Sequence, residues 1–390
     1  MKILHCCLAN FYIDNYSYQE NIITKIHKIQ GHDVEIIAST ETYLDNLKLG
    51  YLKPGSYISR DNIKVTRIPY IRQIPHTIVK KLRLYEGLNN KLSTFKPDVI
   101  FLHDCQFLSI NSIVRYARRN DVKIYVDSHT DFVNSARGWI SKNILHKIIY
   151  KYCAKRIEKY TINFYGTLPL RCDFLHEVYG IKKDKIKLLP FGVDDSLFSY
   201  SDKGKYRETI LKDLEIPSDD FVFITGGKID ERKKIHVLIK AFADLVNEKS
   251  LSNFHLIVFG KPTLEMKNII SELTIHKNIH YIEWIDSKNL FKYFFASDLA
   301  IFPGTHSVLW EEAVGLGIPS IFYSWKGIQH LDKGGNCLYI KNNSYDELKE
   351  TLCYIISNPD VVKKMKEISA EVGPKYFSYS NIARKAIETN

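Results

Sequence analysis

The strongest constraint on the fold is a repeated alternation of short apolar runs with longer amphipathic segments. The apolar runs cover residues 3–8, 34–38, 98–102, 123–126, 221–225, 256–259, 280–282, 299–302 and 319–322. Between them, helical patterns such as Ile235, Leu238, Ile239 and Phe242 place apolar side chains on one face. Strand, helix and strand in this order require parallel pairing. We therefore expect an α/β fold built on doubly wound parallel sheets.

The alternation runs through the chain twice, which indicates two domains. With 390 residues the chain is too long for one compact core. A polar stretch over residues 188–220 separates the halves and is interpreted as a linker. We predict one Rossmann-like domain over residues 1–192 and a second over residues 193–374. Ligands of such sheets bind beyond the carboxyl ends of the strands, so we expect the two domains to face one cleft.

Positive charge is concentrated in the first half of the chain. Residues 1–190 hold 30 Lys and Arg against 17 Asp and Glu, whereas the remaining 200 residues hold 25 against 27. The first half is therefore expected to face something anionic, such as a phospholipid surface, a phosphorylated acceptor or nucleic acid. Four lysines recur every four residues and share one ridge of a helix, namely Lys147, Lys151, Lys155 and Lys159. Such a helix suits an anionic membrane, and a merely solvated face is the open alternative.

Composition argues against secretion and against metal or disulfide frameworks. No stretch approaches the roughly 18 apolar residues of a membrane span, and the first apolar run lacks the features of a signal peptide. Seven cysteines are scattered without a CxxC pair. We expect a cytoplasmic protein, with docking on the inner face of the cell membrane left open by the basic helix. No nucleic acid partner is expected, because no module of that class is recognisable.

One loop of the second half has groups that suit a nucleotide diphosphate. After the strand that ends at Thr225 the chain reads Gly226-Gly227-Lys228, and Lys233 stands at the mouth of the next helix. Glycines let the backbone approach a ligand closely, and cations neutralise its phosphates. A solvated basic loop is the alternative for these residues taken alone.

A second loop, residues 303–319, also follows a buried strand. Thr305 or Ser307 is expected to cap a helix whose N-terminus stabilises an anion by roughly 0.3–1 kcal/mol. Glu312 lies a little over one turn into that helix, where it would accept hydrogen bonds from a ribose diol. Taken alone, it would be one of a surface pair of glutamates.

Together the two loops resemble the large retaining glycosyltransferase family usually numbered four, which has the GT-B fold. The family's Gly-Arg-Leu, Lys-Gly and Leu-Ile-x-Ala-Phe elements correspond to Gly227-Lys228-Ile229, Lys233-Lys234 and Leu238–Phe242. Its Glu-Ala-x-x-x-Gly-x-Pro element corresponds to Glu312-Ala313, Gly317 and Pro319. Shorter matches extend over essentially the whole chain. The resemblance implies that residues 375–390 form a helix that returns to the N-terminal domain.

The resemblance also implies roles for individual residues. Those around the donor are Gly227, Lys228, Lys233, His306, Ser307, Val308, Leu309 and Glu312. In this set Lys228 and Lys233 would hold the diphosphate and Glu312 the ribose. His129, which follows the strand at 123–126, resembles the histidine near the reaction centre, so His129, Lys228 and Lys233 are the candidate catalytic residues. Candidate acceptor contacts in the first half are Asn10, Glu20, His103 and Asp131, the last of which is alternatively a helix cap.

The implied activity is transfer of a sugar, with retained configuration, from a nucleotide-diphosphate sugar to a saccharide or lipid-linked saccharide. Bacterial cell-surface polysaccharide or lipopolysaccharide biosynthesis is the expected setting. No cofactor is expected, and no divalent metal, because no convincing Asp-x-Asp is present. The family's first glutamate is missing, since Gly304 stands eight residues before Glu312 and His306-Ser307 occupy the place of its Glu-Gly. The alternative is therefore a catalytically impaired GT-B-like nucleotide-binding partner subunit.

Overall fold

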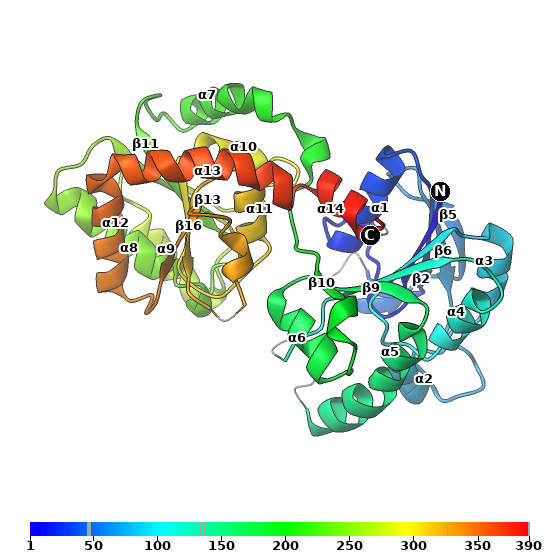
Figure 1. Cartoon of the computed structure of the whole chain (residues 1–390). Coiled ribbons are helices and arrows are strands. Elements are labelled where there is room, and N and C mark those ends of the chain that lie inside the picture. The colour runs from blue at the N-terminus through cyan, green and yellow to red at the C-terminus, as the bar shows by residue number, and fades with distance from the viewer. Residues whose placement is uncertain (45–47, 133–134, 136–137, 326, 389–390) are drawn as a thin grey trace. The chain divides into compact units, whose positions relative to one another are not determined.

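A computed structural model of the chain confirms the α/β fold with two parallel-sheet units. It describes residues 1–44, 48–132, 135, 138–325 and 327–388. The first compact unit is Met1–Pro190 with Ile382–Asn390, and the second is Phe191–Asn381. The chain thus changes unit two residues before the predicted boundary at 192, and it returns at Ile382 rather than at 375. The two units are described separately below (Figure 1).

The first unit is built on an eight-stranded sheet. Its strands are β1 (Lys2–Cys7), β2 (Asp33–Ser39), β5 (Gly55–Ile58), β6 (Lys64–Ile68), β7 (Val99–His103), β8 (Lys123–Ser128), β9 (Thr161–Gly166) and β10 (Ile186–Leu188). They are hydrogen-bonded in the order β10-β9-β8-β7-β1-β2-β6-β5, and only the edge pair β5–β6 is antiparallel. A separate antiparallel pair is formed by β3 (Glu41–Tyr43) and β4 (Leu49–Tyr51).

Helices cover this sheet because alternate strand residues are apolar toward each face. The helical elements are α1 (Gln19–Ile29), α2 (His76–Leu82), α3 (Leu88–Phe95), α4 (Ile110–Ala117), the π-helix η1 (Ser141–Tyr150), α5 (Lys151–Glu158), α6 (Pro169–Glu177), η2 (Lys183–Lys185) and the end of α14 (Tyr379–Ala386). Leu4 and Cys6 of β1 pack into the core cluster that holds side chains of α3 to α6. His5, between them, points to the opposite face and contacts His27 of α1.

The second unit has six parallel strands in the order β13-β12-β11-β14-β15-β16. They are β11 (Phe221–Gly226), β12 (Phe254–Phe259), β13 (Ile279–Ile282), β14 (Leu299–Phe302), β15 (Ser320–Tyr323) and β16 (Cys337–Ile340). In chain order this is the 3-2-1-4-5-6 arrangement of the doubly wound fold. The order reverses between β11 and β14, and ligands of such sheets bind at that switch point. The two loops singled out in the sequence follow these two strands.

Two apolar layers cover the second sheet. The helical elements are η3 (Asp195–Leu197), η4 (Tyr200–Asp202), α7 (Lys203–Asp213), η5 (Glu231–Lys233), α8 (Ile235–Glu248), α9 (Leu264–Leu273), α10 (Leu290–Ala296), α11 (Leu309–Gly315), η6 (Gln329–Leu331), α12 (Tyr345–Ser357) and α13 (Pro359–Phe377). Val222 and Ile224 pack with α7, α10 and α11, whereas Phe223 packs with α8, α9 and α12. Both faces of β11 are therefore buried, as a parallel strand requires.

One sequence interpretation of the second unit is wrong, and another differs in its bounds. The supposed linker contains α7, whose Arg207 donates a hydrogen bond to the carbonyl of Asp220 at 3.0 Å and so ties the helix to the start of the sheet. The expected terminal helix does return to the first unit, but it begins at Tyr379 rather than at residue 375, because α13 continues to Phe377.

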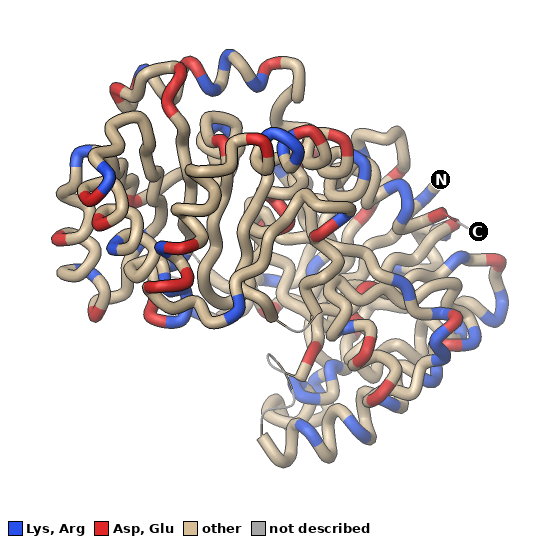
Figure 2. The backbone as a smooth tube through the Cα atoms, turned by 60° about the vertical axis from the view of Figure 1, so that its left-hand side comes forward, with Lys and Arg blue, Asp and Glu red and all other residues tan. Residues whose placement is uncertain are grey.

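The distribution of charge differs between the units. Figure 2 shows Lys and Arg spaced along the helices of the first unit, while acidic and basic positions interleave on the second. Among the described residues, no helix is long and apolar enough to cross a membrane.

Candidate functional site

The loops after β11 and β14 are joined to each other at the switch point of the second unit. The backbone N–H of Thr305 donates to the carbonyl of Arg232 at 3.1 Å. Lys233 Nζ donates to the carbonyls of Thr305, at 2.6 Å, and His306, at 3.0 Å. A Cβ atom on Gly304 would lie 2.3 Å from the Arg232 carbonyl oxygen, so only glycine lets the loops approach this closely. Close packing of the two loops therefore explains why Gly304 stands at this position.

Partial burial disfavours the charged form of Lys233. It is half-buried, and burial lowers the pKa of its ammonium to about 8 although Asp230 works in the opposite direction. A phosphate group beside it would restore the charged form. Lys228 is exposed, and Asp230 pairs with Arg232 at 2.7 Å. The predicted phosphate-binding lysines therefore stand at one end of the sheet, one solvated and one partly desolvated.

The β11 loop also touches the start of α11. Gly227 has a φ of +109°, and a Cβ there would lie 2.8 Å from Leu309 Cδ1. The predicted capping by Thr305 or Ser307 is wrong. Val308 is the N-cap and makes no side-chain cap, while the carbonyl of Ser307, rather than its hydroxyl, accepts from the Trp310 N–H at 3.0 Å.

Glu311 is a buried carboxylate that sequence reasoning missed. Its side chain is 0% exposed, and it accepts hydrogen bonds from His306 Nε2 at 3.0 Å and from His330 Nε2 at 3.2 Å. Burial works to raise its pKa, but His306 and then His330 outweigh burial and lower the pKa to about 2. The alternative interpretation of a surface pair of glutamates is therefore wrong for Glu311, which is buried and charged. The sequence feature that indicated burial was the neighbouring Trp310, a large apolar residue in the same turn of the helix.

Glu312 behaves in the opposite way. Its side chain is partly exposed, and no hydrogen bond to its carboxyl group joins it to another described residue. Burial, then the charge of Glu311, then that of Asp194 raise its pKa to about 8. The predicted ribose ligand is therefore a largely protonated acid at neutral pH with its hydrogen-bonding capacity unused within the described residues.

In the first unit, the predicted His129 is paired with a buried carboxylate. Asp127, at the end of β8, is fully buried, and its Oδ2 lies 3.4 Å from His129 Nε2 and 3.1 Å from His103 Nδ1. Burial works to raise the pKa of Asp127, but the two histidines lower it. Burial works to lower the pKa of His129, but Asp127 and, more weakly, Glu20 raise it. His129 itself is 25% exposed, so it is the outermost member of the cluster.

Behind Asp127 the cluster continues as a chain of imidazoles. His103 Nε2 lies 3.0 Å from His5 Nδ1, and His5 Nε2 lies 3.0 Å from His27 Nδ1. His27 Nε2 donates to the carbonyl of Ala383 in α14 at 2.8 Å. Burial lowers the pKa of His5, and it lowers that of His27 to about 4. The acceptor contact predicted for His103 is wrong, since the side chain is 0% exposed and both of its nitrogens are engaged.

The loop that carries His129 is held by a residue that was not predicted. Asp104 has a φ of +68°, and its carboxylate accepts from the Ser128 hydroxyl at 3.3 Å, the His129 N–H at 3.3 Å and the Thr130 hydroxyl at 3.1 Å. Because it follows His103 directly, its place after a buried strand was the available signal.

The remaining predicted acceptor contacts have mixed surroundings. Glu20 is buried in the first turn of α1, close enough to act on His129, and Asn10 is half-buried just after β1. Asp131 is buried and pairs with Arg171 at 3.2 Å, so its carboxylate is already occupied in part. Among the described residues, no group of three or more His, Cys, Asp or Glu side chains is placed to hold a metal ion.

Comparison of sequences identifies relatives of part of the chain. Residues 206–372, within the second unit, match the family described as Glycosyl transferases group 1. Mannosylfructose-phosphate synthase of Agrobacterium fabrum is 21% identical over 252 residues, which cover 62% of this chain and 53% of that protein. An uncharacterised glycosyltransferase of Methanocaldococcus jannaschii is 28% identical over 250 residues, which cover 58% and 55%. The chain thus spans about half the length of these curated relatives.

Solved structures match the chain over almost its full length. A glycosyltransferase of Rickettsia africae has a TM-score of 0.66 at 16% identity, covering 98% of this chain and 96% of that one. Anabaena HepE in complex with UDP has a TM-score of 0.65 at 14% identity, with coverage of 99% and 98%. WaaG, a glycosyltransferase involved in lipopolysaccharide biosynthesis, has a TM-score of 0.60 at 15% identity, with coverage of 98% of each chain. Residues 206–372 of the second unit are therefore similar to glycosyl transferases group 1, and the chain as a whole has the GT-B fold.

Proposed function

We propose that the protein transfers a sugar, with retention of configuration, from a nucleotide-diphosphate sugar to a saccharide or lipid-linked saccharide. The observation that carries the proposal is that the loops after β11 and β14, which meet at the switch point, bring Lys233 and the start of the helix with Glu312 to the same end of the sheet. Lys233 is a partly desolvated cation with a pKa near 8, and Glu312 is a carboxyl group with no hydrogen-bond partner among the described residues. A diphosphate and a ribose diol would satisfy the two in turn.

The transfer reaction has one further requirement that the second unit would meet. The leaving diphosphate needs its negative charge stabilised, and Lys228 and Lys233 would supply this without a divalent metal. Uridine donors are the first to test, because HepE, which shares the fold, was solved with UDP. His129 is proposed as a further catalytic residue from the family resemblance, supported by its raised pKa and partial exposure.

Release of nucleoside diphosphate tests the proposal directly. UDP release from UDP-sugars, with a bacterial glycolipid extract as acceptor, should fall at least about a hundredfold in Lys233→Ala and Glu312→Ala. Lys234→Gln is the matched control, since Lys234 pairs with the exposed Glu231 and should change the rate less than about twofold. Activity in EDTA and the anomeric configuration of the product test metal independence and retention. Full activity in both site variants would overturn the site.

The alternative is a nucleotide-binding partner subunit without catalysis. It is favoured by His306, which stands where the family pattern has its first glutamate and which is bound to the buried Glu311. Saturable UDP binding that is weakened by Lys233→Ala, with neither transfer nor donor hydrolysis under any acceptor, would favour this alternative over the enzyme.

An exposed apolar ridge supports docking on the inner face of the cell membrane, in cell-surface polysaccharide or lipopolysaccharide assembly. Ile140, Ile144, Ile148 and Tyr152 are exposed by 56%, 38%, 62% and 47% and recur every four residues along η1 and α5. Lys147 and Lys151 are exposed in the same segment. Apolar side chains beside lysines suit an anionic bilayer, to which a lipid-linked acceptor would be confined. The predicted lysine ridge itself is weaker than expected, because Lys155 pairs with Glu158.

Vesicle flotation measures this docking. Ile144→Ser with Ile148→Ser should reduce binding to vesicles that contain phosphatidylglycerol. Ile58→Ser, which alters a side chain of similar exposure in β5, should leave binding unchanged. Equal flotation of all three proteins would exclude the ridge.

A further inference from the structure

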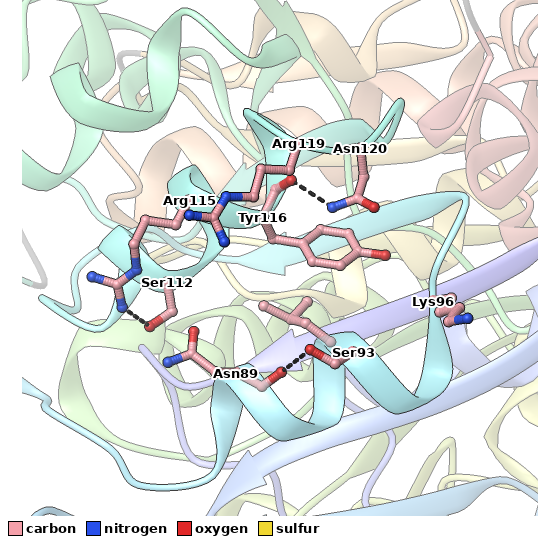
Figure 3. A pocket seen from close by; sticks show the side chains of 9 residues that line it. Asn89, Ser93, Lys96, Ser112, Arg115, Tyr116, Arg119 and Asn120 are labelled. Carbon is pink, nitrogen blue, oxygen red and sulfur yellow. Dashed lines mark hydrogen bonds between the residues drawn. The ribbon is translucent and has the colours of Figure 1, made fainter.

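A pocket of about 580 Å³ lies between α3 and α4 of the first unit (Figure 3). Helix α3 leads into the amino end of β7, and α4 leads into the amino end of β8. His103 and His129 lie instead at the carboxyl ends of those strands. The pocket is therefore at the opposite edge of the sheet from the histidine cluster, and no role for it follows from the proposed transfer reaction.

The lining of the pocket carries three cations and no acid. Lys96, Arg115 and Arg119 line it, and none of the other lining residues is Asp or Glu. Within the described part of the chain, none of these three forms an ion pair, whereas Lys91 and Arg171 of the same unit do. The Arg115 guanidinium donates one hydrogen bond, to the Ser112 hydroxyl at 3.0 Å, which leaves its other donors available.

The spacing of the arginines suits one oxyanion. Arg115 lies in α4, and Arg119 follows in the turn that ends it, so the two are four residues apart and share one side. Like charges at this spacing repel each other, and an anion between them removes the repulsion. Guanidinium groups bind phosphate through paired, planar N–H donors. Cations are favoured at a helix C-terminus in any case, so the cavity beside them is the decisive observation.

The rest of the lining is polar and aromatic. Figure 3 shows Arg115, Tyr116 and Arg119 of the α4 side facing Asn89 and Ser93 of α3 across the hollow. The Ser93 hydroxyl donates to the backbone carbonyl of Asn89 at 3.0 Å, so this bond does not occupy the Asn89 side-chain amide. Amide and hydroxyl groups bind sugar hydroxyls, and the face of a tyrosine packs on a sugar ring. At this volume the pocket is in the range of small-molecule sites, roughly 300–1,000 Å³, and much larger than a phosphate ion.

We propose that this pocket binds a phosphate ester of a polyol, with the phosphate between Arg115 and Arg119 and the polyol toward Asn89 and Tyr116. Two sources share this chemistry, a soluble sugar phosphate and the headgroup of an anionic lipid. The proposal is independent of the donor site, because every residue that it uses belongs to the first unit.

Calorimetry of the full chain with glucose 6-phosphate, glucose and inorganic phosphate tests the proposal. We expect saturable binding of the ester, weaker binding of inorganic phosphate and none of glucose. The double variant Arg115→Gln with Arg119→Gln should weaken ester binding at least tenfold. Arg118→Gln is the matched control, because Arg118 lies in the same turn but donates to the Tyr160 hydroxyl outside the pocket, and it should bind within twofold of the parent. Lys233→Ala should also bind normally, which separates this site from the donor site.

Vesicles distinguish the two sources. If phosphatidylglycerol vesicles bind through Arg115 and Arg119 and soluble glucose 6-phosphate does not, the ligand is a lipid headgroup. Binding of the soluble ester alone identifies a sugar phosphate. The three cations are exposed, so the variants should keep the melting temperature of the parent, and circular dichroism checks this. The proposal fails if neither probe binds, or if the double variant and Arg118→Gln bind both probes equally well.

Discussion

Each unit buries one carboxylate between two histidines, yet the two clusters treat the charge differently. In the first unit Asp127 contacts His103 and His129, and the contacts continue through His5 and His27. In the second unit Glu311 contacts His306 and His330, and the cluster ends there. The residue next to Glu311 in the chain is a second acid, Glu312, rather than a further histidine.

The comparison shows that a buried carboxylate affects its neighbours differently in the two units. Around Asp127 the partners extend inward and only His129 is partly exposed, so the cluster positions a single accessible imidazole, with a raised pKa, beyond the end of β8. Around Glu311 the two histidines lower its pKa to about 2, whereas burial, and then the charge of Glu311, raise the pKa of the adjacent Glu312 to about 8. The first arrangement orders a base, and the second holds an acid in its less common form.

Removing the carboxylate of the first cluster should have the largest effect. Asp127→Asn leaves two histidine N–H groups facing an uncharged amide inside the protein, and we expect the free energy of unfolding to fall by about 3–5 kcal/mol. Urea denaturation at pH 7 measures this. Asp121→Asn, at an exposed position, should change stability by less than about 0.5 kcal/mol. In the folded variant, NMR titration should show a lower pKa for His129 than in the parent. An unchanged unfolding midpoint would show that the histidines do not depend on this charge.

The corresponding change in the second unit should cost less and should depend on pH. The pKa of Glu311 is about 2 in the folded chain and near 4.5 when unfolded, so its stabilisation is present above pH 4.5 and is lost as the pH falls toward 2. We expect Glu311→Gln to cost about 2–3 kcal/mol at pH 7. The gap between variant and parent should narrow through that acid window in denaturation curves. A gap that stays constant with pH would mean that the cost is one of packing alone.

Glu312 should show the reverse sign. Its pKa is raised, so the folded chain keeps a proton that the unfolded chain loses near pH 4.5, and stability declines from about pH 4.5 to pH 8. Glu312→Gln removes this decline, and we expect it to be more stable than the parent by at least about 1 kcal/mol at pH 8 and equal to it at pH 4. Thermal unfolding across this range measures the difference. A variant less stable than its parent at pH 8 contradicts the raised pKa.

The smallest expected effect is a fraction of a proton exchanged when UDP binds near pH 8. Ribose hydroxyls that donate to Glu312 favour its ionised form and release a proton, while the diphosphate favours charged Lys233 and takes one up. The two nearly cancel in the parent. We expect net uptake in Glu312→Gln and net release in Lys233→Met, measured by calorimetry in buffers of different ionisation enthalpy. Proton exchange of the same sign in both variants would show that one of these residues does not contact the bound nucleotide.

Sequence reasoning reached the fold because periodicity and strand order are local properties. Alternating apolar runs identified most of the strands, and loops after β11 and β14 emerged as candidates because glycines and lysines there follow buried strands. The buried clusters were out of reach, because His5, His27 and His103 are far apart in the chain and meet only through the register of β1, α1 and β7. Glu311 and Glu312 are adjacent in sequence, and only the packing of α11 separates their environments.

The imidazole chain of the first unit also obeys a proton count. The Ala383 carbonyl can only accept, so His27 must give it the proton on Nε2 and accept one from His5, and His5 in turn accepts one from His103. Four hydrogen bonds down to Asp127 need four protons, but three neutral imidazoles bring three. The pKa of Asp127 is lowered, so the fourth proton makes one imidazole of the row an imidazolium, with Asp127 as its counter-ion. The Ala383 carbonyl in α14 therefore sets the direction of every hydrogen bond in the row. Without that contact, each imidazole could adopt the opposite tautomer.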